Sequence, residues 1–330
     1  MLYFSVIIPV FNRPDEVFEL LESLALQTNK NFEVLIVEDG SEITCENIVN
    51  QFSEKLNIQY FSKVNEGPGL SRNYGALRAK GNYFVFFDSD CIIPPNYFQI
   101  VTDALSDNYT NSYGGPDMAH PSFSDIQKAI SFSMTSFFTT GGIRGGKKSL
   151  EKFHPRSFNM GFSKEVFEKT GGYSKMRFGE DIDLSLRILE AGFTAQLIQK
   201  AAVYHKRRVD FRKFFKQVHN SGIARINLYK RHPKSLKMVH FLPTAFVCGT
   251  IFLLFAGIFF PFLFGFLVFY FLLLWCEAFF QYKNLKIAFL AIPASIVQLF
   301  GYGSGFLISF WKRIVLHKSE FHAFSTNFYK

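Results

Sequence analysis

The sequence predicts an α/β domain with a mostly parallel sheet, followed by C-terminal membrane helices. Short β-rich runs with few charges alternate with helical patterns through the first ninety residues, the order expected of βαβ units around a parallel sheet. A long run without charged residues near the C-terminus indicates membrane spans. The expected strands are 3–8, 32–37, 57–62 and 83–87, and the expected helices are 14–26, 42–54 and 68–79.

The chain is less regular after the fourth strand. Residues 114–150 are rich in Gly, Ser and Thr, which favours a long flexible loop region. Residues 156–164 then predict a short strand, and residues 179–192 predict a helix closed by Gly192. Residues 209–230 place Phe and Val at helical spacing with Lys and Arg on other faces, which is typical of a basic helix that lies on a membrane surface.

The apolar C-terminal region predicts two or three membrane segments. Residues 238–276 contain no Asp, Glu, Lys or Arg, which is too long for one span of about 20 residues and suits a hairpin that turns near Pro261. The uncharged run 287–311 is long enough for a third span, but that span would leave the basic residues after it on the outer side, against the positive-inside rule. Re-entry or an interfacial position for this last segment therefore stays open. A very apolar soluble core is the alternative, although soluble helices rarely stay uncharged over such a length.

The basic charge is concentrated just before the apolar region. The net charge is +9, and the segment 200–237 alone holds twelve Lys or Arg and one acid, Asp210. Such a segment marks the cytoplasmic side of an inner membrane and attracts anionic lipid. We expect no nucleic-acid partner, because no zinc-finger or RNA-binding motif accompanies the basic run. The predicted domains are 1–208 (catalytic), 209–237 (basic interfacial segment) and 238–330 (membrane region, with segments at about 240–260, 262–282 and 287–311).

Two aspartates follow the fourth expected strand directly. In extended chain, residues i and i+2 point to the same side, so Asp88 and Asp90 can converge at the sheet edge. Two close carboxylates repel unless a cation or a proton separates them, and oxygen ligands favour Mg²⁺ or Mn²⁺. Helix capping is the alternative reading of this pair. A second acidic turn, Glu38–Asp39, follows a neighbouring strand and favours the metal interpretation.

The motif GEDID places three acids in the first turn of a helix. The helix dipole stabilises carboxylates there, which explains Glu180, Asp181 and Asp183 without any function. The same dipole keeps a carboxylate ionised, as a general base requires.

His205 and Arg72 are the remaining candidates. His205 follows a short apolar strand and suits a third metal ligand, because neutral imidazole binds Mn²⁺, although a lone His is more often structural. Arg72 follows a Gly-Pro-Gly helix entry, where backbone N–H groups and a guanidinium suit a phosphate or nucleotide, with a surface Arg as the alternative.

The motifs SVIIPVFNR, VEDGS, GPGLSRNYGALRAKGNYFVFFDSD, NMGFSKEVFEKTGGY and FGEDIDLSLRILEAG occur in the order seen in family 2 glycosyltransferases of the GT-A fold. The chain resembles that family over about residues 3–208. The resemblance implies that Pro9, Phe11 and Asp39 line the nucleotide-base pocket. It also implies that Arg72 lies near the base or diphosphate and that Asp88 faces the ribose and the metal side.

The same resemblance implies that Asp90 ligates the cation that bridges the diphosphate, that His205 completes the metal site and that Asp181 deprotonates the acceptor hydroxyl. The loop beneath the acceptor and sugar would contain Asn159, Met160, Gly161 and Glu180.

The activity implied is inverting, metal-assisted transfer from a nucleotide-sugar, by default a UDP-sugar, to a lipid-linked or polysaccharide-precursor hydroxyl. No QxxRW motif follows the GEDID helix, so a single transfer is favoured over processive synthesis. Two alternatives remain. A nucleotidyltransferase would need a Gly-rich, basic loop after the first strand, where this chain has PVFNRPDE, and a catalytically inactive membrane scaffold would not need its acidic residues together.

Overall fold

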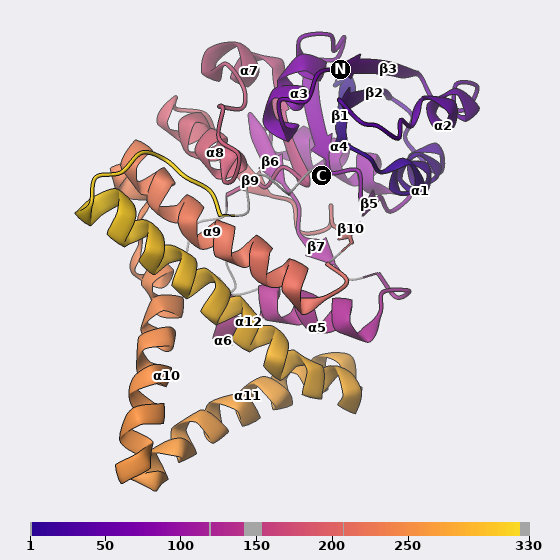
Figure 1. The fold of residues 1–330 in the computed structure, drawn as a ribbon. Helices are drawn as coiled ribbons and strands as arrows, with labels where there is room; N and C mark the ends of the chain where they lie inside the picture. The colour runs from indigo at the N-terminus through magenta and orange to yellow at the C-terminus, as the bar shows by residue number, and fades with distance from the viewer. Residues whose placement is uncertain (1, 119, 142–153, 207, 324–330) are drawn as a thin grey trace. The chain divides into compact units, whose positions relative to one another are not determined.

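The computed structural model divides the chain into two compact units (Figure 1). The first unit comprises Met1–His120 and Phe153–Lys206, and the second comprises Pro121–Lys152 and Arg207–Lys330. The structure describes residues 2–118, 120–141, 154–206 and 208–323.

The first unit is built on a large, mostly parallel sheet, as predicted. Its strands are β1 (Phe4–Val10), β2 (Phe32–Asp39), β3 (Ile58–Lys63), β4 (Tyr83–Phe87), β6 (Ser112–Gly114), β8 (Asn159–Ser163) and β9 (Ala195–Leu197). Within the described residues their order is β3-β2-β1-β4-β8-β6-β9, and β8 is antiparallel to both of its neighbours. The four strands expected from the sequence are confirmed as β1 to β4.

Helices cover both faces of this sheet because successive strand residues point to opposite sides. Val6 and Ile8 of β1 belong to a core shared with one set of helices, whereas Ile7 belongs to a core shared with the other set. The first set is α1 (Pro14–Ala25), α2 (Glu46–Gln51) and α4 (Tyr97–Asp107), and the second is α3 (Pro68–Ala76), α7 (Lys164–Thr170) and α8 (Glu180–Glu190).

A second, small sheet follows the aspartate pair. It joins β5 (Cys91–Ile92), β7 (Asp117–Met118) and β10 (Val203–His205) in the order β5-β10-β7. The register places His205 opposite Cys91 and Val203 opposite Asp117. Three segments that are far apart in the sequence therefore meet beside Asp90.

The second unit is helical. Its helices are α5 (Asp125–Thr135), α6 (Phe137–Thr140), α9 (Phe211–Arg231), α10 (Leu242–Phe259), α11 (Phe264–Tyr282) and α12 (Leu285–Phe310). Short helical turns are η1 (Pro233–Ser235), η2 (Met238–Phe241), η3 (Pro261–Leu263) and η4 (Trp311–Val315).

Residues 121–141 differ from the expectation. The sequence analysis placed them in the catalytic domain as part of a flexible loop, but they form α5 and α6 in the helical unit. Ala129, Ile130 and Met134 of α5 share a core with α9 and α12, and this burial stabilises helix where local composition favours loop. The rest of the expected loop, residues 142–152, lies outside the described residues.

Glycines allow α9 and α12 to pack closely. A Cβ at Gly305 would lie 2.1 Å from the backbone oxygen of His219, and one at Gly222 would lie 2.2 Å from that of Tyr302. The run Gly301–Gly305, which is unusual for a membrane helix, is thus a helix-packing surface.

Three helical segments in the described part of the second unit are long and apolar enough to cross a membrane: Met238–Phe259, Pro261–Tyr282 and Leu285–Val315. They match the three hydrophobic segments expected from the sequence.

Candidate active site

The strand order reverses direction between β1 and β4, because β2 and β3 extend the sheet on one side of β1 and β4 lies on the other. Ligands in open α/β sheets bind beyond the carboxyl ends of strands at such a switch point. Arg13, after β1, and Asp90, after β4, meet there, with Arg13 Nη1 donating to Asp90 Oδ2 at 2.6 Å. Burial alone would lower the pKa of Arg13, but the charge of Asp90 and its hydrogen bond raise that pKa above its ordinary value.

The small sheet brings His205 to the aspartate pair, as the metal interpretation requires. His205 Nε2 lies 3.2 Å from Asp90 Oδ1 and 3.9 Å from Asp88 Oδ2. The imidazole stacks on Phe158, with ring centroids 4.9 Å apart, and this fixes the plane of the ring.

Asp117 lies behind His205. Its side chain is fully buried, and its Oδ2 is 3.9 Å from His205 Nδ1. A carboxylate near the second ring nitrogen favours the tautomer with its proton on Nδ1, in which Nε2 can bind a cation. No sequence signal marked Asp117, because it lies in the segment expected to be a loop and only β7 pairing brings it to β10.

The donor set fits a divalent cation. Among the described residues, Asp90, Cys91 and His205 offer ligand atoms within 4.8 Å of one another. Burial, followed by the charges of Asp90 and Asp88, raises the pKa of the Cys91 thiol well above its ordinary value. Asp90 supplies an oxygen donor and His205 a nitrogen donor, with Asp88 Oδ2 3.9 Å from the imidazole, and the nitrogen donor suits Mn²⁺ better than Mg²⁺.

Arg72 of α3 is buried and links this helix to the segment after β4 and to the start of α8. Its Nη2 donates to Asp88 Oδ1 at 2.6 Å, and its Nη1 donates to Glu180 Oε1 at 3.2 Å. The guanidinium also lies 5.2 Å from the ring centroid of Tyr173. Its side chain is 3% exposed, so the sequence alternative of a surface Arg is wrong.

Glu180, which accepts a hydrogen bond from Arg72, and Asp181 are the first two residues of α8. Burial, and after it the charge of Asp181, raises the pKa of Glu180 to about 7, although Arg72 opposes the shift. Asp181 Oδ1 accepts the N–H of Ile182 at 2.8 Å, and its Oδ2 lies 3.8 Å from Arg156 Nη1. Asp183 pairs with Arg187 within the same helix, at 2.9 Å.

Asp39 anchors the turn that leads into α3. Its Oδ1 accepts from Lys63 Nζ at 3.0 Å and from the N–H of Glu66 at 2.9 Å, and its Oδ2 accepts from the N–H of Gly67 at 2.8 Å. Gly67 has φ of +93°, a conformation that favours glycine at this helix entry. Pro9 is buried near the end of β1 and Phe11 is half-buried just beyond it.

Asn159, Met160 and Gly161 are buried in strand β8, which confirms the short strand predicted over residues 156–164 and differs from the loop that the resemblance implies. Asn159 Oδ1 accepts from the hydroxyl of Tyr97 at 2.6 Å, and a Cβ at Gly161 would lie 2.2 Å from the ring of Tyr113. Pairing with β4 and β6 on both sides holds these residues in the sheet.

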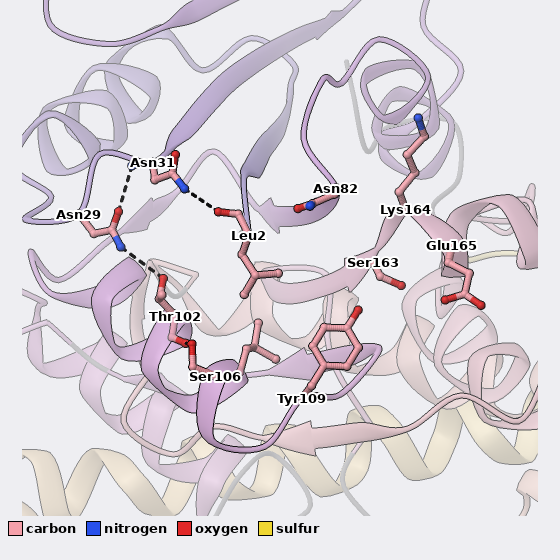
Figure 2. Close-up of a pocket in the computed structure, with 11 residues that line it drawn as sticks. Leu2, Asn29, Asn31, Asn82, Thr102, Ser106, Tyr109, Ser163, Lys164 and Glu165 are labelled. Atoms are coloured by element: carbon pink, nitrogen blue, oxygen red, sulfur yellow. Dashed lines mark hydrogen bonds between the residues drawn. The ribbon is translucent and has the colours of Figure 1, made fainter.

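Figure 2 shows a hollow at the opposite edge of the main sheet. Its lining includes Leu2, Asn31 and Asn82, which precede β1, β2 and β4, and its polar side chains bond one another, as in the bond from Asn29 Nδ2 to Thr102 Oγ1. The hollow therefore lies at the amino ends of the strands, apart from the Asp88–Asp90–His205 cluster.

Residues 5–171 match the family described as glycosyl transferase family 2. The chain belongs to glycosyl transferase family 2. An uncharacterized glycosyltransferase of Haemophilus influenzae is 31% identical over 210 residues, which cover 61% of this chain and 67% of that relative. An uncharacterized glycosyltransferase of Rickettsia felis is 40% identical over 104 residues, which cover 32% of this chain. The chain spans 15% to 17% of the length of this and two further Rickettsia relatives.

Solved structures share the fold of this family 2 chain at low sequence identity. A mannosyltransferase from Pyrobaculum calidifontis, in complex with GDP-Man and Mn²⁺, has a TM-score of 0.61 and 16% identity, and the likeness covers 91% of this chain and 87% of that one. TarS 1-349 of S. aureus has a TM-score of 0.51 and 17% identity, with 96% and 92% covered. These likenesses confirm the GT-A fold that the motifs predict.

Sequence reasoning named the acidic residues of this candidate site, together with Arg72 and His205, but missed three residues that contact members of this set. Arg13 stands in the quoted motif PVFNR, directly after the first strand, so its place in the chain was a usable signal. Asp117 and Tyr173 carried no such signal, because tertiary pairing alone brings them to His205 and Arg72.

Proposed function

We propose that the chain is an inverting glycosyltransferase that moves a sugar from a nucleotide-diphosphate donor to a hydroxyl acceptor. The observation that carries this proposal is the convergence of Asp88, Asp90 and His205 at the switch point between β1 and β4. Family membership supports it, since the matched region contains both aspartates.

The donor base would bind at the carboxyl ends of β1 and β2, against Pro9, Phe11 and Asp39. The Asp39 carboxylate already accepts three hydrogen bonds from the chain, and a carboxylate has about four acceptor positions. One position is thus left for an N–H of the base. A uridine donor is our default, and the GDP-Man complex of the archaeal mannosyltransferase makes guanosine the second choice to test.

Asp90 and His205 would hold the cation, Mn²⁺ in preference to Mg²⁺, and Asp88 would face the ribose beside them. Such an ion neutralises the diphosphate leaving group when bound. Asp117 would orient the imidazole, and Arg72 would hold Asp88 in place through its 2.6 Å bond.

Asp181 would take the proton from the acceptor hydroxyl as the hydroxyl attacks the sugar from the face opposite the leaving group. It lies in the first turn of α8, at the positive end of the helix dipole, and Arg156 at 3.8 Å adds a positive charge on the same side. Glu180 and strand β8 would form the wall beneath acceptor and sugar.

The acceptor would be a lipid-linked or polysaccharide-precursor hydroxyl at the cytoplasmic face of the inner membrane. The three apolar segments of the second unit and the basic residues that precede them support a membrane location. An active site held at the bilayer would then meet lipid-linked acceptors at high local concentration.

The test is a panel of sugar nucleotides incubated with membranes that contain the protein, with Mn²⁺ or Mg²⁺. We expect one sugar nucleotide to be consumed and nucleoside diphosphate to be released. Release of pyrophosphate would instead indicate a nucleotidyltransferase, and absence of both turnover and UDP–Mn²⁺ binding would indicate an inactive scaffold.

Two variants separate the proposed roles. Asp181→Asn should abolish transfer and keep UDP–Mn²⁺ binding, whereas Asp90→Asn should lose both. Asp107→Asn, an exposed substitution at the end of α4, is the matched control and should keep both. Full transfer by Asp90→Asn would contradict the proposal.

A further inference from the structure

Helix α12 connects the two open ends of the α10–α11 hairpin. It begins three residues after α11 ends, and Trp275 of α11 contacts Phe289 in its first turns, with centroids 5.8 Å apart. Its second half lies against the start of α10, where the rings of Phe241 and Phe306 are 5.2 Å apart and a Cβ at Gly303 would lie 2.7 Å from the backbone oxygen of Pro243. Figure 1 shows α10 and α11 meeting at η3, with α12 closing the third side.

This arrangement fixes the depth of both ends of α12. The two legs of the hairpin have 18 and 19 residues and share one tip, so they return to the same side of a membrane. The start of α12 lies by the end of one leg, and its second half lies by the start of the other. A helix that joins two points at the same depth runs along the membrane rather than across it.

Helix α9, which packs along α12, also indicates that α12 runs along the membrane. His219 Nδ1 lies 3.1 Å from Ser304 Oγ, near the middle of the segment Leu285–Val315. A crossing α12 would therefore carry the neighbouring α9 residues Lys216 and Asn220 toward the bilayer centre, where charged and polar side chains are costly. Burial agrees with this position: 44% of the most apolar stretch of the segment Leu285–Val315 is buried inside the protein, compared with 11% for the segment Pro261–Tyr282.

The tip of the hairpin is entirely apolar. No side chain between Ile251 and Phe269 is polar, and Phe260 and Phe262 at the turn are 58% and 72% exposed. A hairpin that crossed the bilayer would place these rings in water on the far side. Each leg is about 27 Å long, slightly shorter than the hydrocarbon core of ~30 Å, and the divergence of the legs reduces their depth further.

We propose that the second unit is monotopic: the hairpin α10–α11 enters the hydrocarbon with its tip inside, while α9 and α12 lie in the interface. The apparent third span, which length and composition alone suggest, is then an in-plane helix. The basic residues at the helix ends away from the hairpin tip would meet anionic lipid headgroups on one face of the membrane. These residues are Lys234, Lys237, Lys283, Lys286, Lys312, Arg313 and Lys318.

A monotopic second unit removes the conflict between a third crossing and the positive-inside rule. Three crossings would put Lys312, Arg313 and Lys318 outside, against the positive-inside rule, whereas an in-plane α12 leaves them on the same face as Lys234. The inference rests on the membrane location proposed above, which flotation of the full-length protein with lipid vesicles tests separately.

Cysteine labelling in sealed vesicles tests the topology. The background carries Cys248→Ala and Cys276→Ala, while Cys45 and Cys91 are buried and shielded. Lys283→Cys and Lys318→Cys bracket α12, and Lys234→Cys is the reference ahead of α10; all three positions are exposed. We expect a membrane-impermeant maleimide to label all three from one face, and none from the other.

Phe262→Cys reports on the tip. We expect labelling from neither face and full labelling once detergent opens the membrane. Labelling of Lys283→Cys and Lys318→Cys from opposite faces would show that α12 crosses and would overturn the proposal, as would labelling of Phe262→Cys from the face opposite Lys234→Cys. Failure of the protein to float with the vesicles would overturn the membrane location itself, and this inference with it.

Discussion

The guanidinium of Arg13 lies on the carboxylate of Asp90, with Nη1 2.6 Å from Oδ2. The other oxygen of Asp90 faces His205 at 3.2 Å. Arg13 therefore neutralises the carboxylate that is best placed to ligate a metal, and a divalent cation has to compete with a resident positive charge.

Removal of this competing charge should strengthen metal binding. We expect Arg13→Ala to lower the Kd for Mn²⁺ about 5-fold, because a partly exposed ion pair is worth about 1 kcal/mol. Titration of free Mn²⁺ by electron paramagnetic resonance measures this without turnover. Lys30→Ala, an exposed charge removal at the other edge of the sheet, should leave the Kd unchanged; weaker Mn²⁺ binding by Arg13→Ala would contradict the competition.

Asp117 should act through His205. We expect Asp117→Asn to weaken Mn²⁺ binding about 10-fold, because partners behind a metal-binding His typically contribute 10- to 100-fold. The affinity for UDP without metal should stay the same, which separates a positioning role from a general loss of structure. Equal Mn²⁺ affinity in variant and parent would show that Asp117 does not position the imidazole.

The effects of substituting Arg72 and Glu180 on the unfolding free energy should be coupled. We expect Arg72→Met to cost about 3–5 kcal/mol of unfolding free energy, because it leaves the buried carboxylate of Glu180 and the partly exposed carboxylate of Asp88 without their cation. Adding Glu180→Gln should recover part of this loss, since one of those carboxylates is then gone. Denaturant unfolding in detergent of the two single variants and the double variant gives the coupling. If the losses of unfolding free energy in the two single variants simply add in the double variant, the 3.2 Å contact between Arg72 Nη1 and Glu180 Oε1 contributes nothing to stability.

Glu180 should make stability depend on pH. Its pKa is raised to about 7 in the folded chain from an ordinary 4.5, so between these values the folded chain holds a proton that the unfolded chain has released. The unfolding free energy should therefore fall as pH rises through this window, by about 3 kcal/mol at most. Glu180→Gln should flatten the dependence, measured as the unfolding midpoint from pH 4 to pH 8. An equally steep fall in the variant would assign the titration to another group.

The glycine contact between α9 and α12 should be sensitive to one added methyl group. A Cβ at Gly305 would lie 2.1 Å from a backbone oxygen, so we expect Gly305→Ala to cost about 1–3 kcal/mol and to lower the thermal midpoint by several degrees. Gly249→Ala is the matched control, because a Cβ there meets no atom of the described residues within 4 Å and Ala favours helix. Equal midpoints for the two variants would contradict the close packing.

Much of the first unit was predictable. Short β-rich runs with few charges indicate strands, and helical patterns lie between them, so β1 to β4 and α1 to α3 lie close to the expected ranges. The positions of Asp88 and Asp90 followed from the same logic, because a carboxylate pair that ends a buried strand must lie at the sheet edge. Residues 121–141 were not predictable, since their helices depend on apolar contacts with α9 and α12, more than seventy residues away.

The sequence by itself determined the family, the parallel sheet, the acidic residues of the site and the apolar segments, because each is encoded in local order and spacing. The tertiary structure decided which groups those residues meet. Arg13 on Asp90, Asp117 behind His205, Arg72 between Asp88 and Glu180, and α12 against both legs of the hairpin all depend on contacts between segments far apart in the chain. Local propensity carries no information about such contacts, because their energy arises only when burial and pairing bring the segments together.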